Sequence, residues 1–192
     1  ERMADSGASQ ALEAAQLWTD AGSAYASRGD LREASDAYDG MQRIAAATEN
    51  DRLKRAYRWD LIAGFHLDAE RPARAAYAIE TLREREGDTP RALTLRSRLA
   101  RALDDPLAAI DYAEQAIEKL AEPKDESAQS AYAAYVEAMR TVNQSDRAAD
   151  QLVEDAATTP DNDALAMAAI DARANAGQFE AAWKESGRLI EK

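Results

Sequence analysis

The segment from Ala15 to Thr48 carries a spacing of aromatic and small residues that two packed helices explain. Four of these residues follow an i, i+3, i+4, i+7 pattern, so they form one stripe along a first helix. The stripe consists of Trp18, Ala21, Gly22 and Tyr25. Gly22 leaves the middle of this stripe without a side chain, which predicts a close approach by a second helix at that point.

A turn and a second stripe follow directly. Gly29-Asp30 is typical of the end of a helix and the start of a tight turn. Ala34 and Tyr38 then continue the pattern on a second, antiparallel helix. We expect the Tyr38 ring to fill the space that the small residues leave, so this segment is predicted to be a helical hairpin explained by packing.

Weaker copies of this pattern recur in phase, and such internal repeats define the fold class. Units are predicted to begin near residues 15, 56, 89, 129 and 163, with two longer intervals after the first and third units. Starting the third unit at Thr89 places Ser97 at position 9 and Ala108 at position 20 of that unit. The fifth unit has its turn at Gly177, in the same phase as Gly29 in the first unit.

The pattern of the first unit resembles the tetratricopeptide repeat (TPR) family at most of its marked positions, and the resemblance extends over about five units. It implies an all-α, right-handed superhelical solenoid of antiparallel helix pairs. Residues 1–192 would form one such domain, with residues 1–14 as an N-terminal helix or cap. A helical bundle that is not a solenoid and a related helical-hairpin repeat are the alternative folds.

Composition supports the all-α class and narrows the partners. The chain is rich in alanine, the strongest helix former, and it has no apolar run long enough for a membrane span. Its net charge of −12 argues against binding nucleic acid or an anionic membrane. The absence of cysteine removes disulfides and thiolate ligands, and it fits either a bacterial cytoplasm or a bacterial periplasm.

The sequence contains no pattern typical of catalysis, so we expect no enzyme activity, no cofactor and no metal. Acidic pairs such as Asp104-Asp105 stand at a predicted turn, where solvated caps are the simpler interpretation. His66 is the one histidine, and it has no second histidine or cysteine with which to bind a metal. We interpret it as a packed core histidine with a hydrogen-bonded ring.

The TPR resemblance implies a function in protein binding, because the first helices of such units line a concave groove. In that family, positions 2, 5, 9, 12 and 13 of a unit meet peptide ligands. We therefore expect a scaffold or adaptor that holds a peptide or protein partner. The corresponding residues here are Gln16, Thr19, Ser23, Tyr57, Asp60, Gly64, Ser97, Arg101, Glu137, Arg140, Met167 and Asp171.

Other functions remain open at this point. Trp183, Leu189 and Ile190 near the C-terminal edge favour self-association, so the chain is alternatively an assembly module or the recruiting arm of a longer multidomain protein. The stretch from Arg71 to Arg101 holds eight arginines and four acidic residues, a net charge of +4. This stretch would recruit an acidic peptide or, as the weakest alternative, a nucleic acid.

Overall fold

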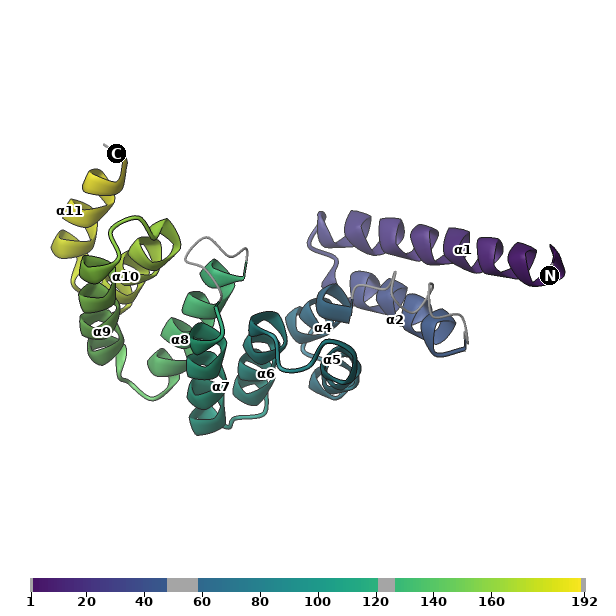
Figure 1. The fold of residues 1–192 in the computed structure, drawn as a ribbon, viewed down its shortest axis with the longest axis horizontal. Helices are drawn as coiled ribbons and strands as arrows, with labels where there is room; N and C mark the ends of the chain where they lie inside the picture. Colours follow the sequence, from purple (N-terminus) through teal and green to yellow (C-terminus); the bar gives the residue numbers. More distant parts are fainter. Residues whose placement is uncertain (1, 48–58, 121–126, 191–192) are drawn as a thin grey trace. The chain divides into compact units, whose positions relative to one another are not determined.

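The computed structural model describes residues 2–47, 59–120 and 127–190, and in these ranges the chain forms α-helices joined by turns, with no β-strand (Figure 1). The chain divides into two compact units, residues 1–82 and 83–192, which are described separately below. Helix labels follow Figure 1. The prediction that residues 1–192 form one solenoid domain stays a prediction.

Unit 1 contains two helix pairs among its described residues, and α2 packs on both α1 and α4. Its helices are α1 (Arg2–Ala26), α2 (Leu31–Ala47), α4 (Trp59–Asp68) and most of α5 (Pro72–Glu86). Residues 2–14 belong to the same helix as the predicted start of the first repeat at Ala15. The Tyr38 ring of α2 stacks on the Phe65 ring of α4, with 4.5 Å between centroids and 11° between planes. This contact connects the first helix pair to the second.

Two glycines allow α1 and α2 to pack closely, and only one of them was expected. A Cβ atom at Gly22 of α1 would lie 2.5 Å from Tyr38 Cε2, which confirms the predicted close approach. A Cβ atom at Gly40 of α2 would lie 2.7 Å from the Trp18 ring. Each glycine therefore holds the space that an aromatic ring of the other helix occupies, although Trp18 is still 42% exposed.

Unit 2 stacks six helices so that each packs on the next (Figure 1). They are α6 (Pro90–Ala102), α7 (Pro106–Glu118), α8 (Ala128–Thr141), α9 (Ser145–Thr158), α10 (Asp163–Asn175) and α11 (Phe179–Ile190). Proline at the first position of α6 and α7 suits a helix start, where no amide donor is needed. Thr89, Asp105 and Asn162 cap their helices with side-chain oxygens. A large cluster of buried residues of unit 2 lies between α8, α9 and α10.

The same turn joins the two helices of each helix pair that the structure describes. In each, one residue has a positive φ, and the next amide donates to the carbonyl five residues back, at 2.8–3.0 Å. This geometry is the Schellman ending of a helix. The residues with positive φ are Gly29, Glu70, Asp104, Asn143 and Gly177. Five residues after each of them stands a buried alanine on the second helix: Ala34, Ala75, Ala109, Ala148 and Ala182.

These turns correct the register of the third unit. Four of these positive-φ residues stand at position 15 of their predicted units. Asp104 instead stands at position 16 of the predicted third unit. The third unit therefore begins at Pro90 rather than Thr89, and its buried alanine is Ala109 rather than Ala108. The prediction was wrong by one residue because alanines stand side by side at 108 and 109, and sequence spacing alone did not separate them.

The described chain is thus an all-α solenoid of antiparallel helix pairs, as the sequence predicted. Among the described residues, no helix is long and apolar enough to cross a membrane. The pairing buries one stripe of each helix and leaves the opposite stripes on the surface, where a partner can reach them.

Candidate functional site

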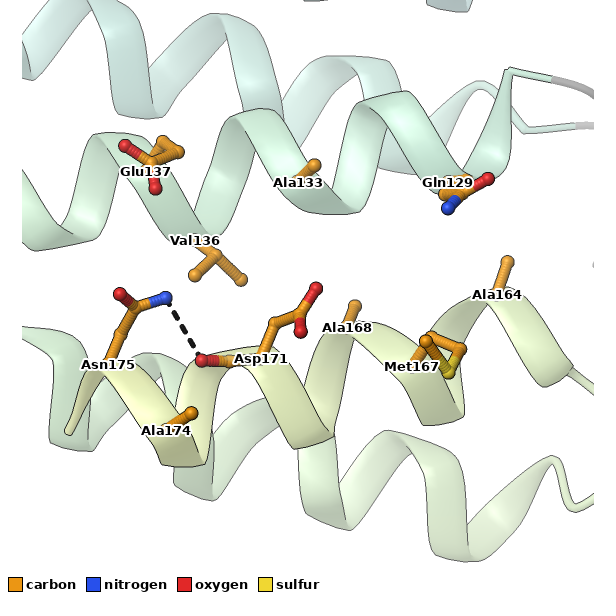
Figure 2. A pocket seen from close by; sticks show the side chains of 10 residues that line it. All are labelled: Gln129, Ala133, Val136, Glu137, Ala164, Met167, Ala168, Asp171, Ala174 and Asn175. Carbon is orange, nitrogen blue, oxygen red and sulfur yellow. Dashed lines mark hydrogen bonds between the residues drawn. The ribbon is translucent and has the colours of Figure 1, made fainter. Parts of the chain in front are cut away.

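A groove of about 320 Å³ lies between α8 and α10, the first helices of the two C-terminal pairs (Figure 2). Both helices face it with residues at helical spacing, so the groove is the space between two parallel stripes. Val136 and Ala168 are buried at its base, while Met167 is 43% exposed on its rim. The lining consists of Gln129, Ala133, Val136, Glu137, Ala164, Met167, Ala168, Asp171, Ala174 and Asn175.

One end of the groove is polar and partly neutralised. Glu137 Oε2 accepts from Arg140 Nη2 at 2.7 Å and from Arg101 Nη2 of α6 at 3.3 Å. Burial lowers the pKa of the Arg101 guanidinium, and the Glu137 carboxylate acts in the opposite direction. The two arginines hold this carboxylate at the edge of the groove.

Asp171 is the second carboxylate of the groove. It is exposed and points toward α8 (Figure 2). The Asn175 amide donates to the backbone carbonyl of Asp171 at 2.9 Å, and not to its carboxylate. In the parts of the chain that the structure describes, no ion pair involves this carboxylate. Asp171 is therefore the negative group of the groove that a ligand could meet.

The structure brings together the predicted site residues of unit 2, with one exception. Glu137, Met167 and Asp171 line the groove, and Arg101 and Arg140 bind Glu137 at its end. Ser97 was predicted to face a ligand, and this is wrong. It is fully buried and its hydroxyl donates to the Ala109 carbonyl at 2.7 Å.

The register explains this error. With the third unit beginning at Pro90, Ser97 occupies position 8, where Gly22 and Ala63 stand in the first two units. This position packs against the second helix and accepts only a small side chain. A shift of one residue rotates a helical position by about 100°, which is enough to turn a groove residue into a core residue.

In unit 1, the predicted residues of α1 bond within their own helix or with side chains of α2. Gln16 is exposed and donates to Asp20 at 2.8 Å. The Thr19 hydroxyl lies 2.9 Å from the Ala15 carbonyl and 3.0 Å from Met41 Sδ, in a half-buried position between α1 and α2. Ser23 shares a hydrogen bond of 3.2 Å with Tyr38 Oη.

The remaining predicted residues of unit 1 are on or before α4. Asp60 and Gly64 lie half-buried on α4, and Tyr57 lies outside the described residues. Their role in binding stays a prediction, as it does for every residue of the predicted set.

Sequence reasoning missed the small residues of the groove. It carried over only the positions at which family members meet ligands, so the alanines and Val136 between those positions were not selected. The signal was present, because both stripes continue at spacings of three and four residues. The missed residues are Gln129 and the small residues Ala133, Val136, Ala164, Ala168 and Ala174, and the tenth lining residue, Asn175, stands at position 13 of the fifth unit.

His66 is a buried structural residue, as predicted. Its side chain is fully buried, and Nδ1 lies 2.7 Å from Ser35 Oγ. Nε2 lies 3.0 Å from Asp39 Oδ1, in an alignment too poor for a hydrogen bond. Burial and the nearby Arg71 lower its pKa to about 4, so the ring is neutral at pH 7. Among the described residues, no group of three or more His, Cys, Asp or Glu side chains could hold a metal ion.

Acidic side chains bind much of the predicted basic stretch. In unit 1, Arg71 pairs with Asp36, and Arg74 pairs with Asp39. In unit 2, Arg96 pairs with Asp88 and lies over the Tyr112 ring, 4.1 Å from its centroid. Arg101 binds Glu137, as described above. Because these charges are paired within each unit, the stretch is a weak footprint for phosphate groups.

Comparisons with known proteins show the fold and no family. No protein-family model matches the chain, and no curated protein matches its sequence. Among solved structures, the chain is similar to the crystal structure of MamA protein, with 18% identity and a TM-score of 0.52. The match covers 93% of this chain and 91% of that chain. It supports the helix-pair arrangement, which fits a TPR-like repeat.

Proposed function

We propose that the chain is a protein-interaction scaffold that holds a segment of a partner in the groove between α8 and α10. The observation that carries this proposal is the meeting of Glu137, Met167 and Asp171 in one groove of about 320 Å³. Helical repeats use such stripes of first helices as extended binding surfaces. The resemblance of the first unit to the TPR family supports the same function.

The chemistry of the groove favours binding over catalysis. Four of its ten lining residues are alanine, and Met167 adds a flexible apolar side chain that adapts to different ligand shapes. Two arginines bind Glu137 and Asp171 is exposed, so a ligand in the groove meets one paired and one accessible carboxylate. A peptide segment with a small apolar anchor fits this surface.

Filling the groove should abolish binding without unfolding the protein. Ala133 is exposed on the wall of the groove, so Ala133→Trp places a large ring in the groove and leaves the core intact. We expect peptides selected from a random library on the wild-type chain to bind this variant at least about tenfold more weakly. Fluorescence anisotropy of the labelled peptides measures the loss.

The control for this experiment is a tryptophan placed elsewhere. Ala73 on α5 is also exposed and is not part of the groove. Ala73→Trp should bind the selected peptides as the wild type does. Peptides that bind Ala133→Trp and the wild type equally would show that the groove is not the binding site.

An assembly module is the second candidate, and α11 carries the observation that favours it. Phe179 and Trp183 stand four residues apart on one face of this helix and are 70% and 82% exposed. Leu189 contributes to a separate apolar pocket with α9 and α10, and the Ile190 side chain lies outside the described part of the structure. Two large aromatic rings on one helix face suit contact with another protein surface. That the chain is the recruiting arm of a longer multidomain protein stays a prediction.

If α11 mediates self-association, the wild-type chain should show concentration-dependent sedimentation, and Trp183→Ser should remain a monomer at the same concentrations. Loss of a large exposed ring removes apolar contact area without disturbing the core. Leu17→Ser on α1 is the control, since Leu17 is 70% exposed on another helix. A wild-type chain that remains a monomer throughout would rule out this candidate.

A further inference from the structure

A second surface of unit 2 lies on the other side of α8. Two hollows of about 410 Å³ and 270 Å³ are both lined by Glu114 of α7 and Arg147 of α9. Because they share these residues, the hollows adjoin each other, and together they are called here the α7–α9 furrow. It shares no lining residue with the groove between α8 and α10.

Three helical stripes build the furrow. One wall is a stripe of α7, the other wall is a stripe of α9, and a stripe of α8 forms the floor. The α7 stripe extends from Leu107 to Glu118, about 16 Å at 1.5 Å per residue. The floor consists of Tyr132, Tyr135, Met139 and Val142, and the α9 wall of Gln144, Arg147, Gln151, Leu152 and Asp155.

The furrow has an apolar base with apolar side chains on one wall. Tyr132 and Tyr135 are each 7% exposed and Met139 is 2% exposed, so the floor is well packed from below. On the α7 wall, Leu107 is 74% exposed. Ile110 and Ile117 of the same wall also line the furrow and are half-buried. A partner that covers this strip would remove substantial apolar area from water.

Acidic side chains follow the edges of this apolar strip. Four carboxylates and one arginine line the furrow, a net charge of −3: Asp111, Glu114, Glu118, Asp155 and Arg147. Neutral glutamine amides donate to Asp111 at 2.8 Å and to Asp155 at 3.1 Å, which leaves their charges in place. In the part of the chain that the structure describes, Glu114 and Glu118 have no ion pair. Arg147 donates to the Gln144 side chain at 3.3 Å.

We propose that the α7–α9 furrow binds an amphipathic helix of a partner protein, with an apolar face on the floor and lysine or arginine along its edges. Basic residues would meet the carboxylates on both walls, and apolar residues would cover Leu107 and the tyrosines. The length of the furrow accommodates about three helical turns. This proposal is independent of the groove between α8 and α10, because the two surfaces share no residue.

We expect the partner segment to be a helix because the furrow offers no free backbone groups with which an extended strand could pair. Both walls and the floor are helices, whose amide and carbonyl groups are already bonded within each helix. An extended segment would find only side-chain partners along the edges, and over the apolar floor its own backbone groups would stay unpaired. A helix satisfies its own backbone and presents only side chains, as in other helix-in-groove complexes.

The test uses a peptide of about 14 residues, made of leucine and lysine at helical period, with a fluorescent label and one photoreactive leucine. It should bind the full chain, and its photo-adducts should map to α7, α8 and α9. Glu114→Lys with Glu118→Lys reverses two wall charges and should weaken binding by about tenfold or more. Leu107→Ser should also weaken it, because apolar contact is lost.

The matched control reverses two charges elsewhere on the same unit. Asp150 and Glu154 are exposed on α9, four residues apart, and line neither hollow. Asp150→Lys with Glu154→Lys changes the net charge by the same amount and should weaken binding by less than about threefold. Equal weakening by both double variants would show non-specific attraction to an acidic protein and would overturn the proposal.

Three further outcomes would also overturn it. The first is equal binding of a peptide in which glutamate replaces lysine or in which the helical period is scrambled. The second is photo-adducts that map outside α7, α8 and α9. The third is a wild-type dimer that Glu114→Lys with Glu118→Lys converts to a monomer, since the occupant would then be a second copy of this chain. Far-UV circular dichroism must show that each variant retains its helices.

Discussion

Replacing Tyr38 with alanine should lower the free energy of unfolding of unit 1 by about 3–5 kcal/mol. Tyr38 is 1% exposed, and its ring joins two helix pairs. It stacks on Phe65 of α4 and fills the space above Gly22 of α1. Alanine would lose both contacts and leave a cavity that rigid helices cannot fully close. The loss is large compared with the total stability of a small unit.

Hydrogen exchange measured by mass spectrometry checks this prediction, because it reports peptides of unit 1 and unit 2 separately. Peptides from α1, α2 and α4 should lose protection in Tyr38→Ala. Tyr38→Phe is the matched control, since it keeps the ring and removes only the hydrogen bond with Ser23. Its expected cost is about 1 kcal/mol. If Tyr38→Ala lost as little stability as the control, the contacts of the Tyr38 ring with α1 and α4 would not stabilise unit 1.

Acidification should destabilise unit 1 through His66 before most carboxylates titrate. The unfolded chain has a histidine pKa near 6.5, and burial together with Arg71 lowers it to about 4 in the folded state. Between these values the unfolded state binds a proton that the folded state does not. Stability is therefore fully present above pH 6.5 and falls progressively toward pH 4, by about 3 kcal/mol in total.

The polar groups that surround His66 all belong to unit 1, so its protonation should destabilise this unit. Ser35, Asp36 and Asp39 face the ring from α2, and Arg71 and Arg74 approach from the start of α5. Asp36 raises the pKa and Arg71 lowers it, but desolvation of the buried ring is the larger effect. The charged ring would have to form in a fully buried site.

Proton NMR measures this prediction directly, because His66 is the only histidine in the chain and gives the only imidazole signals. We expect these signals to titrate well below pH 6.5, and denaturant unfolding at pH 7 and pH 5 to show lower stability at pH 5. His66→Gln should remove most of this difference. A measured pKa above 6.5 would reverse the slope and show that Asp39 stabilises the charged ring.

The groove shows how far the sequence leads toward the candidate site. Glu137, Met167 and Asp171 were predicted from their unit positions, and all three line one groove. The same reasoning failed for Ser97, because the register of the third unit was wrong by one residue. It also gave no indication of the α7–α9 furrow, which depends on residues from three helices and matches no ligand position of the resembling family.

By itself, the sequence determined the helical class and the pairing of the helices. These depend on contacts between residues close in the chain: stripes at helical spacing, small residues where helices cross, and glycine at some turns. Tertiary structure alone decided which stripes face each other across α8. The groove and the furrow form where helices from different pairs meet, and a rotation of about 100° per residue makes each facing residue depend on an exact register.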